Sequence, residues 1–315
     1  MAEKKPGARN NDSISLSIII PTFNYGHLLS RVIESILCQK LPEGCGTSTE
    51  NIEIIVVDDG STDNTPEIID SLLTKTTLSL TYVKQENSGA GVARNHGLIL
   101  SKGAYIYFID ADDELLPGAL SSIISAVKSN SLATVFLGGN VTIQRNGKKK
   151  QYLPPEKIPT AGCKKLNNYL IRKKISVNHG SIVATRELII QRPYVEIFDT
   201  REDIPVFAYL IYYGVVETVQ QPWVAIHKHT SSLRHNTTTS EKKGEILVDE
   251  VFNPLPKECQ YLRDQYAAQR YASIFRSEIH AGNKKVARRY FFRALKLDLN
   301  QTLRWSNIRR LIGLY

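Results

Sequence analysis

Three short apolar runs in the first 115 residues each end in a polar cluster. The runs cover residues 17–20, 54–57 and 105–109, and the clusters that follow them begin at Pro21, Asp58 and Asp110. Short β-branched runs separated by helix-length segments predict parallel strands of an α/β sheet. Because ligands bind at the carboxyl ends of such strands, we expect the three clusters to meet in one crevice.

The cluster that begins at Asp110 is the strongest candidate for a metal site. Side chains alternate in extended chain, so Asp110 and Asp112 project the same way on either side of the small Ala111. Their carboxylates suit Mg²⁺ or Mn²⁺, which prefers oxygen ligands and keeps room for water and phosphate groups. An acidic turn or a helix N-terminus would explain the same residues taken alone.

The cluster that begins at Asp58 is predicted to lie on a strand-to-helix loop. Thr65 is expected at the N-cap of the next helix and Pro66 in its first turn. An ionised Asp at this strand end could accept a charge-assisted hydrogen bond from the N3–H of a uracil. An acidic turn built around Gly60 is an equally good interpretation of these residues alone.

A further polar stretch, residues 87–97, follows a predicted strand at residues 80–84 and opens a helix. Gly89 and Gly91 would let the backbone approach a ligand closely, and the helix N-terminus favours an anion. Arg94 lies one turn inside this helix. In isolation, the stretch is read more simply as a flexible loop with a surface arginine.

Taken together and in this order, residues 21–24, 58–63, 87–95 and 110–113 resemble the motifs of the family 2 glycosyltransferases of the GT-A fold. The resemblance covers about residues 15 to 235. It implies an α/β fold with a Rossmann-like, mostly parallel sheet flanked by helices, and we expect a helical C-terminal extension. It also implies transfer of a sugar from a nucleotide diphosphate donor to an acceptor hydroxyl, with inversion.

The resemblance further implies roles for individual residues. Asp112 would be the principal ligand of a Mn²⁺ or Mg²⁺ cofactor, with Asp110 and His229 beside it. His229 is preferred to His227, and surface histidines on a strand and loop are the alternative interpretation. The donor would contact Pro21, Thr22, Asn24, Asp58, Asp59, Asn87, Gly89, Arg94, Asp110, Ala111, His229 and Arg234.

An inverting transfer needs a base that removes the proton of the acceptor hydroxyl. Glu202 and Asp203 resemble the family's Glu-Asp pair at the start of a helix, which implies that Asp203 is the base and Glu202 its catalytic neighbour. Glu202 would raise the pKa of Asp203 and Arg201 would lower it, and the sequence does not decide between them. Helix capping by an acidic pair is the alternative.

The overall composition predicts a soluble chain with a cytoplasmic active site. No run approaches the about 20 consecutive apolar residues that span a bilayer. We expect residues 1–14 to be a disordered lead-in without a signal peptide, residues 15–240 to form the catalytic domain and residues 241–315 to form a helical, basic region. The four scattered cysteines are interpreted as reduced thiols.

The positive charge of the chain is concentrated at its C-terminal end. Residues 261–315 hold 12 Lys and Arg against 3 Asp and Glu, so they carry a net charge of +9, equal to that of the whole chain. Apolar positions there have helical spacing in three stretches, around residues 271–275, 286–297 and 303–314. A basic amphipathic end can bind an anionic membrane, which predicts peripheral attachment to the inner membrane face, and a helical bundle with a solvated basic face is the alternative. Nucleic acid is not an expected partner, because no nucleic-acid-binding module accompanies the charge.

The function expected from these features is metal-dependent glycosyl transfer in the synthesis of a surface polysaccharide, such as lipopolysaccharide. A UDP-sugar is the expected donor and a glycan or glycolipid the acceptor. A nucleotidyltransferase would be expected to carry a Gly-x-Gly-Thr-Arg loop after the first strand, which residues 21–24 lack. A noncatalytic nucleotide-sugar-binding adaptor would need neither Asp112 nor Asp203. The donor sugar, the acceptor, the linkage and the oligomeric state stay open.

Overall fold

The computed structural model of the chain describes residues 15–41, 51–74, 79–228 and 241–303. It divides into two compact units, one of residues 1–160 and 176–229 and the other of residues 161–175 and 230–315. Residues 161–175 thus group with the C-terminal helices, which nothing in the sequence indicated. The predicted lead-in, residues 1–14, lies outside the described residues.

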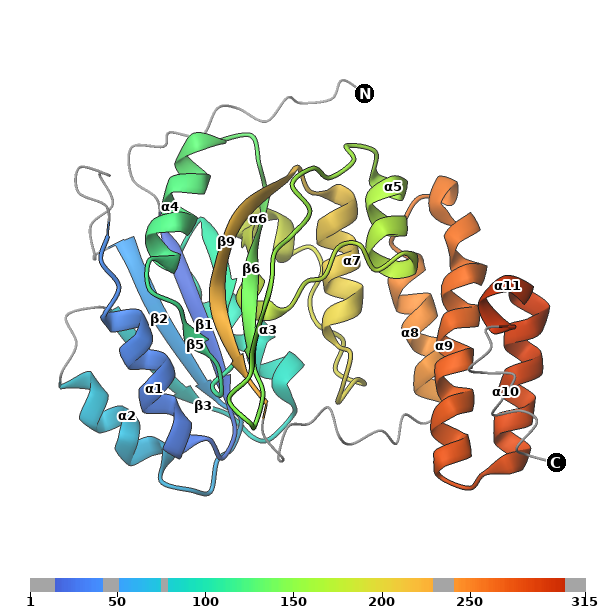
Figure 1. The fold of residues 1–315 in the computed structure, drawn as a ribbon. Coiled ribbons are helices and arrows are strands. Elements are labelled where there is room, and N and C mark those ends of the chain that lie inside the picture. Colours follow the sequence, from blue (N-terminus) through green and yellow to red (C-terminus); the bar gives the residue numbers. More distant parts are fainter. Residues whose placement is uncertain (1–14, 42–50, 75–78, 229–240, 304–315) are drawn as a thin grey trace. The chain divides into compact units, whose positions relative to one another are not determined.

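The first unit is built on one sheet, to which the described residues contribute nine strands (Figure 1). The strand order is β3-β2-β1-β4-β8-β6-β9-β5, and β7 pairs with β6. The strands are β1 Leu16–Thr22, β2 Ile52–Asp58, β3 Ser79–Lys84, β4 Tyr105–Phe108, β5 Glu114–Leu115, β6 Val135–Ile143, β7 Lys149–Tyr152, β8 Ile182–Thr185 and β9 Val216–His227. The helices of this unit are α1 Gly26–Leu37, α2 Thr65–Leu73, α3 Ala90–Leu100, α4 Ala119–Ser129, α6 Arg186–Ile189 and α7 Asp203–Tyr213.

The predicted α/β class is confirmed, and the sheet is more mixed than the apolar runs indicated. The strands β3, β2, β1 and β4 are parallel, as the helix-length spacing of their runs predicts. Strand β8 pairs antiparallel with both β4 and β6, whereas β6 and β9 are parallel. The four parallel strands place the ends of β1, β2 and β4 along one edge of the sheet, where the polar clusters follow.

The start of α2 differs in detail from the prediction. The helix begins at Thr65 with Pro66 in its first turn, but the N-cap position is Asn64, so the expectation that Thr65 is the cap is wrong. The reason is Asp63, whose Oδ1 accepts hydrogen bonds from the Thr65 backbone N–H at 3.1 Å and the Thr65 hydroxyl at 2.6 Å. The side chain two residues upstream therefore satisfies the first helical N–H.

Packing of α3 on the sheet fixes the position of Arg94. One face of the sheet, including Ile18 and Ile20, packs in the core with α1 and α2. On the other face, a Cβ added to Gly97 of α3 would lie 2.4 Å from Ile19 Cγ2. Because only a glycine permits this approach, α3 lies close on β1, and Arg94 is held one turn earlier in the same helix.

The second unit is helical, as predicted. Its elements are α5 Gly162–Leu166, a π-helical turn Asn167–Ile171, α8 Glu241–Phe252, a 3₁₀ turn Lys257–Cys259, α9 Tyr261–His280, α10 Lys284–Leu297 and α11 Leu299–Thr302. Helices α9 and α10 run side by side and bury Phe275, Tyr290 and Phe291. The third predicted amphipathic helix, at residues 303–314, lies almost entirely outside the described residues. Among the described helices, none combines the length and the apolarity needed to cross a membrane.

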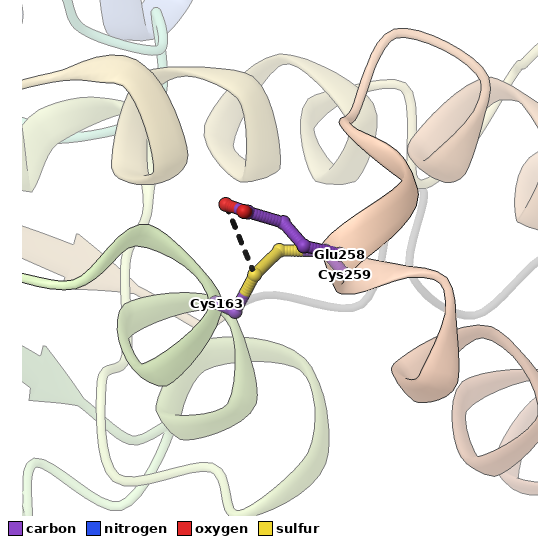
Figure 2. A group of neighbouring side chains, drawn as sticks. All are labelled: Cys163, Glu258 and Cys259. Atoms are coloured by element: carbon purple, nitrogen blue, oxygen red, sulfur yellow. Dashed lines mark hydrogen bonds between the residues drawn. A yellow bond between two sulfur atoms is a disulfide. The ribbon is translucent and has the colours of Figure 1, made fainter.

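A disulfide joins the two segments of the second unit. Cys163 of α5 and Cys259 are bonded, with their Cα atoms 5.4 Å apart, and Figure 2 shows Glu258 beside them. The expectation of reduced thiols is therefore wrong for this pair, because cysteines separated by 96 positions meet only once residues 161–175 have joined the C-terminal helices. Cys38 is free and exposed, and Cys45 lies outside the described residues.

Loss of this disulfide should destabilise the protein. The bond closes a loop with a sequence separation of 96, and cross-linking a loop of that size removes denatured-state entropy worth about 4 to 5 kcal/mol. Reduction, or the substitution Cys163→Ser, should therefore lower the free energy of unfolding by about 2 to 5 kcal/mol in a denaturant titration. Cys38→Ser is the matched control and should change little. A titration midpoint unmoved by reductant would contradict the stabilising role.

Candidate active site

An acidic cluster follows β4 at the edge of the sheet. Asp110, Asp112 and Asp113 each offer a carboxylate oxygen, and these oxygens lie within 4.8 Å of one another. The turn is closed by a hydrogen bond of 3.0 Å from the Asp113 N–H to the Asp110 carbonyl oxygen, and Ala111 is buried inside it. Three hard oxygen donors fit a Mg²⁺ or Mn²⁺ ion. The structure thus brings the predicted Asp110 and Asp112 together and adds Asp113. It does so through a turn, so the expectation that Asp110 and Asp112 lie in extended chain is wrong.

Arg94 is the buried centre of the site. Its Nη2 donates to Asp110 Oδ1 at 2.7 Å and its Nη1 donates to Glu202 Oε1 at 2.8 Å, while its own side chain is 5% exposed. Burial lowers the pKa of Arg94, but the carboxylates of Asp110 and Glu202 outweigh it, and the pKa lies above its ordinary value. The simpler interpretation of Arg94 as a surface residue is therefore wrong. One guanidinium connects the acidic cluster to the predicted catalytic pair.

The predicted catalytic pair lies at the start of α7. Glu202 occupies the N-cap position and Asp203 is the first helical residue. The preceding Arg201 has a φ of 67°, an uncommon value for a residue with a side chain, and such strain concentrates at functional sites. Glu202 accepts from Arg94, and Asp203 stands in the first turn of the helix.

Two buried residues of the site carry no recognisable sequence signal. His179, from a 3₁₀ turn before β8, has its Nδ1 at 4.0 Å from Asp110 Oδ1 and its Nε2 at 3.1 Å from the Tyr194 hydroxyl. The Tyr194 ring lies 5.5 Å from the guanidinium carbon of Arg94. Burial, in the first place, raises the pKa of Tyr194, so its hydroxyl stays protonated. Together these side chains pack behind the arginine and the acidic cluster.

The histidines proposed from sequence have a different outcome. His229 and Arg234 lie outside the described residues, so their assigned roles stay predictions. His227 is on β9, and its Nε2 lies 3.3 Å from Glu114 Oε2 on the neighbouring β5. Among the described residues, the histidine that lies beside the acidic cluster is His179, which the sequence did not indicate, and His227 pairs with Glu114 instead.

The two carboxylates at the end of β2 hold the neighbouring loops through hydrogen bonds. Asp58 is fully buried, and its oxygens accept from the Ser61 N–H at 2.7 Å and the Tyr82 hydroxyl at 2.6 Å. Asp59 accepts from the Ser88 N–H at 2.9 Å and the Gly89 N–H at 2.7 Å, as well as from the Gln85 amide. These bonds hold the loop that opens α3, where Gly89 has a φ of 95° that favours glycine. A donor-binding role for Asp58 and Asp59 stays a prediction, whereas their hydrogen bonds to the loops are observed.

Asn24 joins the end of β1 to the same loop region. Its φ is 55°, its side-chain oxygen accepts from the Thr62 N–H at 2.8 Å, and its N–H donates to Ser61 Oγ at 2.8 Å. Asn87 is exposed on the neighbouring loop, where a Cβ added to Gly60 would lie 3.0 Å from the Asn87 nitrogen. The loops after β1, β2 and β3 therefore converge, whereas the sequence predicted a meeting of the clusters that follow β1, β2 and β4.

Thr22 supplies a buried polar atom at this edge. Thr22 follows the buried Pro21 and is 3% exposed, and within the described part of the chain its Oγ1 has no hydrogen-bond partner. Leaving a buried hydroxyl unpaired costs free energy, which a ligand can recover by pairing with it.

Sequence comparison with known proteins finds similarity to glycosyltransferases. The sequence model of "Glycosyl transferase family 2" matches residues 17–192. The chain is 30% identical over 152 residues to the "Uncharacterized glycosyltransferase YibD" of Escherichia coli, covering 48% of this chain and 42% of that protein. It is 37% identical over 134 residues to the "GalNAc(5)-diNAcBac-PP-undecaprenol beta-1,3-glucosyltransferase" of Campylobacter jejuni, covering 42% of this chain and 40% of that protein.

The fold comparison reaches further along the chain. The solved structure of Staphylococcus aureus TarS 1-349 in complex with UDP-GlcNAc superposes with a TM-score of 0.58 at 18% identity, covering 96% of this chain and 79% of that one. This similarity confirms the expected fold. The sequence matches, by contrast, span less than half the length of these two curated relatives.

Proposed function

Since its family model matches residues 17–192 of 315, the chain belongs to glycosyl transferase family 2, and from that premise we propose that it transfers a sugar from a nucleotide diphosphate donor to an acceptor hydroxyl. The observation that carries this proposal is the pairing of one buried arginine with two carboxylates from distant segments. Arg94 joins Asp110, at the predicted metal side, to Glu202, beside the predicted base. A transfer reaction needs a group that stabilises the departing diphosphate and a base for the acceptor hydroxyl, and this site offers a candidate for each.

On the donor side, the acidic cluster would hold the cofactor. Asp110, Asp112 and Asp113 present the oxygen ligands that Mn²⁺ or Mg²⁺ prefers. A divalent ion bound there would neutralise the charge of the departing diphosphate. Arg94 holds the Asp110 carboxylate in position before the donor binds, so little reorganisation is needed during transfer.

On the acceptor side, Asp203 is proposed as the base. Its carboxylate would take the proton of the acceptor hydroxyl as the oxygen attacks the anomeric carbon from the face opposite the diphosphate, which inverts the configuration. Glu202 is engaged by Arg94 and would fix the start of α7. The neighbouring pair thus divides into a proton acceptor and a positioning carboxylate.

A UDP-sugar is the proposed donor, and a glycan or glycolipid of a surface polysaccharide is the proposed acceptor. The TarS neighbour was solved with UDP-GlcNAc, and the Campylobacter jejuni relative is named for transfer to an undecaprenol-linked glycan. The unpaired Thr22 hydroxyl and the converging loops near Asp59 provide polar groups for a nucleotide. For an acceptor carried on lipid, we propose that the enzyme works at an anionic membrane surface.

A nucleotide-sugar screen tests the donor proposal. A donor at about 100 times its Kd should raise the stability of the folded protein by about 2.7 kcal/mol, which corresponds to a rise in Tm of roughly 4 °C for a chain of this size. The screen compares UDP-sugars with GDP- and dTDP-sugars, with Mn²⁺ and with chelator, and then measures release of the nucleoside diphosphate.

The two readouts of this screen separate the possible functions. Stabilisation by a UDP-sugar together with metal-dependent release of UDP is the expected result. Stabilisation without any release, even with glycan acceptors, would instead indicate a noncatalytic adaptor. Stabilisation by no nucleotide sugar would contradict the proposal.

A further inference from the structure

Helix α10 has a buried face and an outward face of mixed character. The buried positions Ala287, Tyr290, Phe291 and Ala294 pack within the second unit. The outward positions of α10 follow one another at helical spacing; they are Lys285, Arg289, Phe292 and Lys296, and the exposed Leu299 begins α11 after the extended Asp298 that ends α10. We refer to these five residues as the outer stripe. Phe292 is 50% exposed and Leu299 is 59% exposed.

The charge around the outer stripe is one-sided. From Lys284 to Thr302 the chain has six Lys and Arg residues and one acidic residue, Asp298. Arg293 points toward the rest of the unit, since it pairs with Glu245 of α8 and lies 4.6 Å from the centre of the Tyr271 ring of α9. The three basic residues of the outer stripe are exposed instead. Positive charge and the exposed aromatic side chain of Phe292 therefore share one face of α10.

We infer that the outer stripe binds an anionic lipid bilayer. Helices that lie in a membrane interface combine basic residues with Phe or Leu at helical spacing, so that cations meet the anionic headgroups while apolar side chains enter the acyl boundary. A nucleic acid would match the basic residues but would gain little from Phe292 and Leu299 without a stacking surface. The proposed function enters this inference at one point: it explains why membrane binding would be useful, since it would bring the enzyme to a lipid-carried acceptor.

Vesicle co-sedimentation of the full chain tests the inference. Vesicles of phosphatidylcholine alone are compared with vesicles that also contain phosphatidylglycerol, at low and high salt. Point substitutions are preferable to a truncation, because residues 161–175 and the C-terminal helices form one unit. The full chain should bind the anionic vesicles at low salt and release them as salt shortens the Debye length.

Two sets of variants test the stripe itself. Lys285→Gln, Arg289→Gln and Lys296→Gln together should lower partition onto anionic vesicles about a hundredfold, since each basic residue near such a surface contributes about fivefold. Phe292→Ser should lower it about tenfold through lost apolar burial. The matched controls are Lys148→Gln, Lys149→Gln and Lys150→Gln together, at and beside the exposed strand β7, and Ile99→Ser, a 75% exposed residue of α3. Both controls should bind as the original chain does.

The outcomes separate this inference from the proposed function. Nucleoside diphosphate release with a water-soluble acceptor should be unchanged in every variant, so an inactive protein that binds vesicles would leave the surface proposal standing and remove only the enzymatic one. Full-chain protein that ignores anionic vesicles at low salt would overturn the surface proposal. An equal loss of vesicle binding in the β7 control would overturn it too, because binding would then depend on diffuse charge. Self-association that Phe292→Ser abolishes, in a chain that does not bind vesicles, would indicate that the outer stripe contacts a second copy of the chain.

Discussion

Replacing Asp203 with asparagine should lower the rate of sugar transfer about 10²- to 10⁴-fold, the range that a positioned general base supplies. Asparagine keeps the size and polarity of the side chain but cannot accept the proton. Because Asp203 stands at the start of α7 and Arg94 is engaged by Glu202, the substitution leaves the buried ion pairs intact. The protein should still bind its donor, measured by thermal shift with the nucleotide sugar.

Glu202→Gln is the matched comparison for this prediction. It removes a charge from the adjacent residue, which directly weakens the charge-assisted bond to Arg94. We expect Glu202→Gln to lower both stability and transfer, whereas Asp203→Asn lowers transfer alone. If Asp203→Asn lost donor binding in proportion to activity, its role would be structural and the base would have to be sought elsewhere.

Replacing Asp112 with alanine should lower transfer by about three orders of magnitude, because a bound divalent ion contributes several kcal/mol of stabilisation to developing charge. The backbone of this residue is held independently of its side chain, since Arg31 of α1 donates to the Asp112 carbonyl oxygen. The variant should therefore fold, as measured by circular dichroism. Chelation of the unaltered enzyme should cause a comparable loss that added Mn²⁺ restores.

An exposed carboxylate outside the cluster provides the control for the metal prediction. Asp70 lies on the surface of α2, and Asp70→Ala removes the same charge without touching the acidic cluster. Its transfer rate and its dependence on Mn²⁺ concentration should match those of the unaltered enzyme. Transfer that persists undiminished through exhaustive chelation would remove the metal from the reaction.

The strands and the acidic motifs could be predicted because each is encoded in a short, continuous stretch of sequence. The β-branched runs ending at Thr22 and Asp58 are strands because consecutive residues carry that signal. The acidic turn at Asp110 and the acidic pair at Asp203 were recognisable for the same reason: their spacing survives in one short stretch of sequence. The roles of these residues in donor binding and proton transfer stay predictions.

Features that depend on distant contacts could not be predicted from such patterns. His179 and Tyr194 have no periodicity or motif of their own, and they enter the site because α3, β8 and the segment before α7 pack together. The bond between Cys163 and Cys259 likewise depends on how residues 161–175 associate. Asp59 was interpreted as a ligand-binding carboxylate, whereas the loop N–H groups that it accepts from are visible only in three dimensions.

The shared arginine gives the site a thermodynamic property that separate pockets would lack. Arg94 shares one positive charge between Asp110 and Glu202. Glu202 lies 108 positions after Arg94 in the chain. A ligand that draws Asp110 toward itself leaves the guanidinium to Glu202 alone and changes the field at the start of α7. Because such coupling is reciprocal, an occupant near α7 changes the affinity for an occupant near Asp110 by the same factor. The affinities of the two substrates of a reaction at this site would therefore be coupled through one side chain, whichever of them binds first.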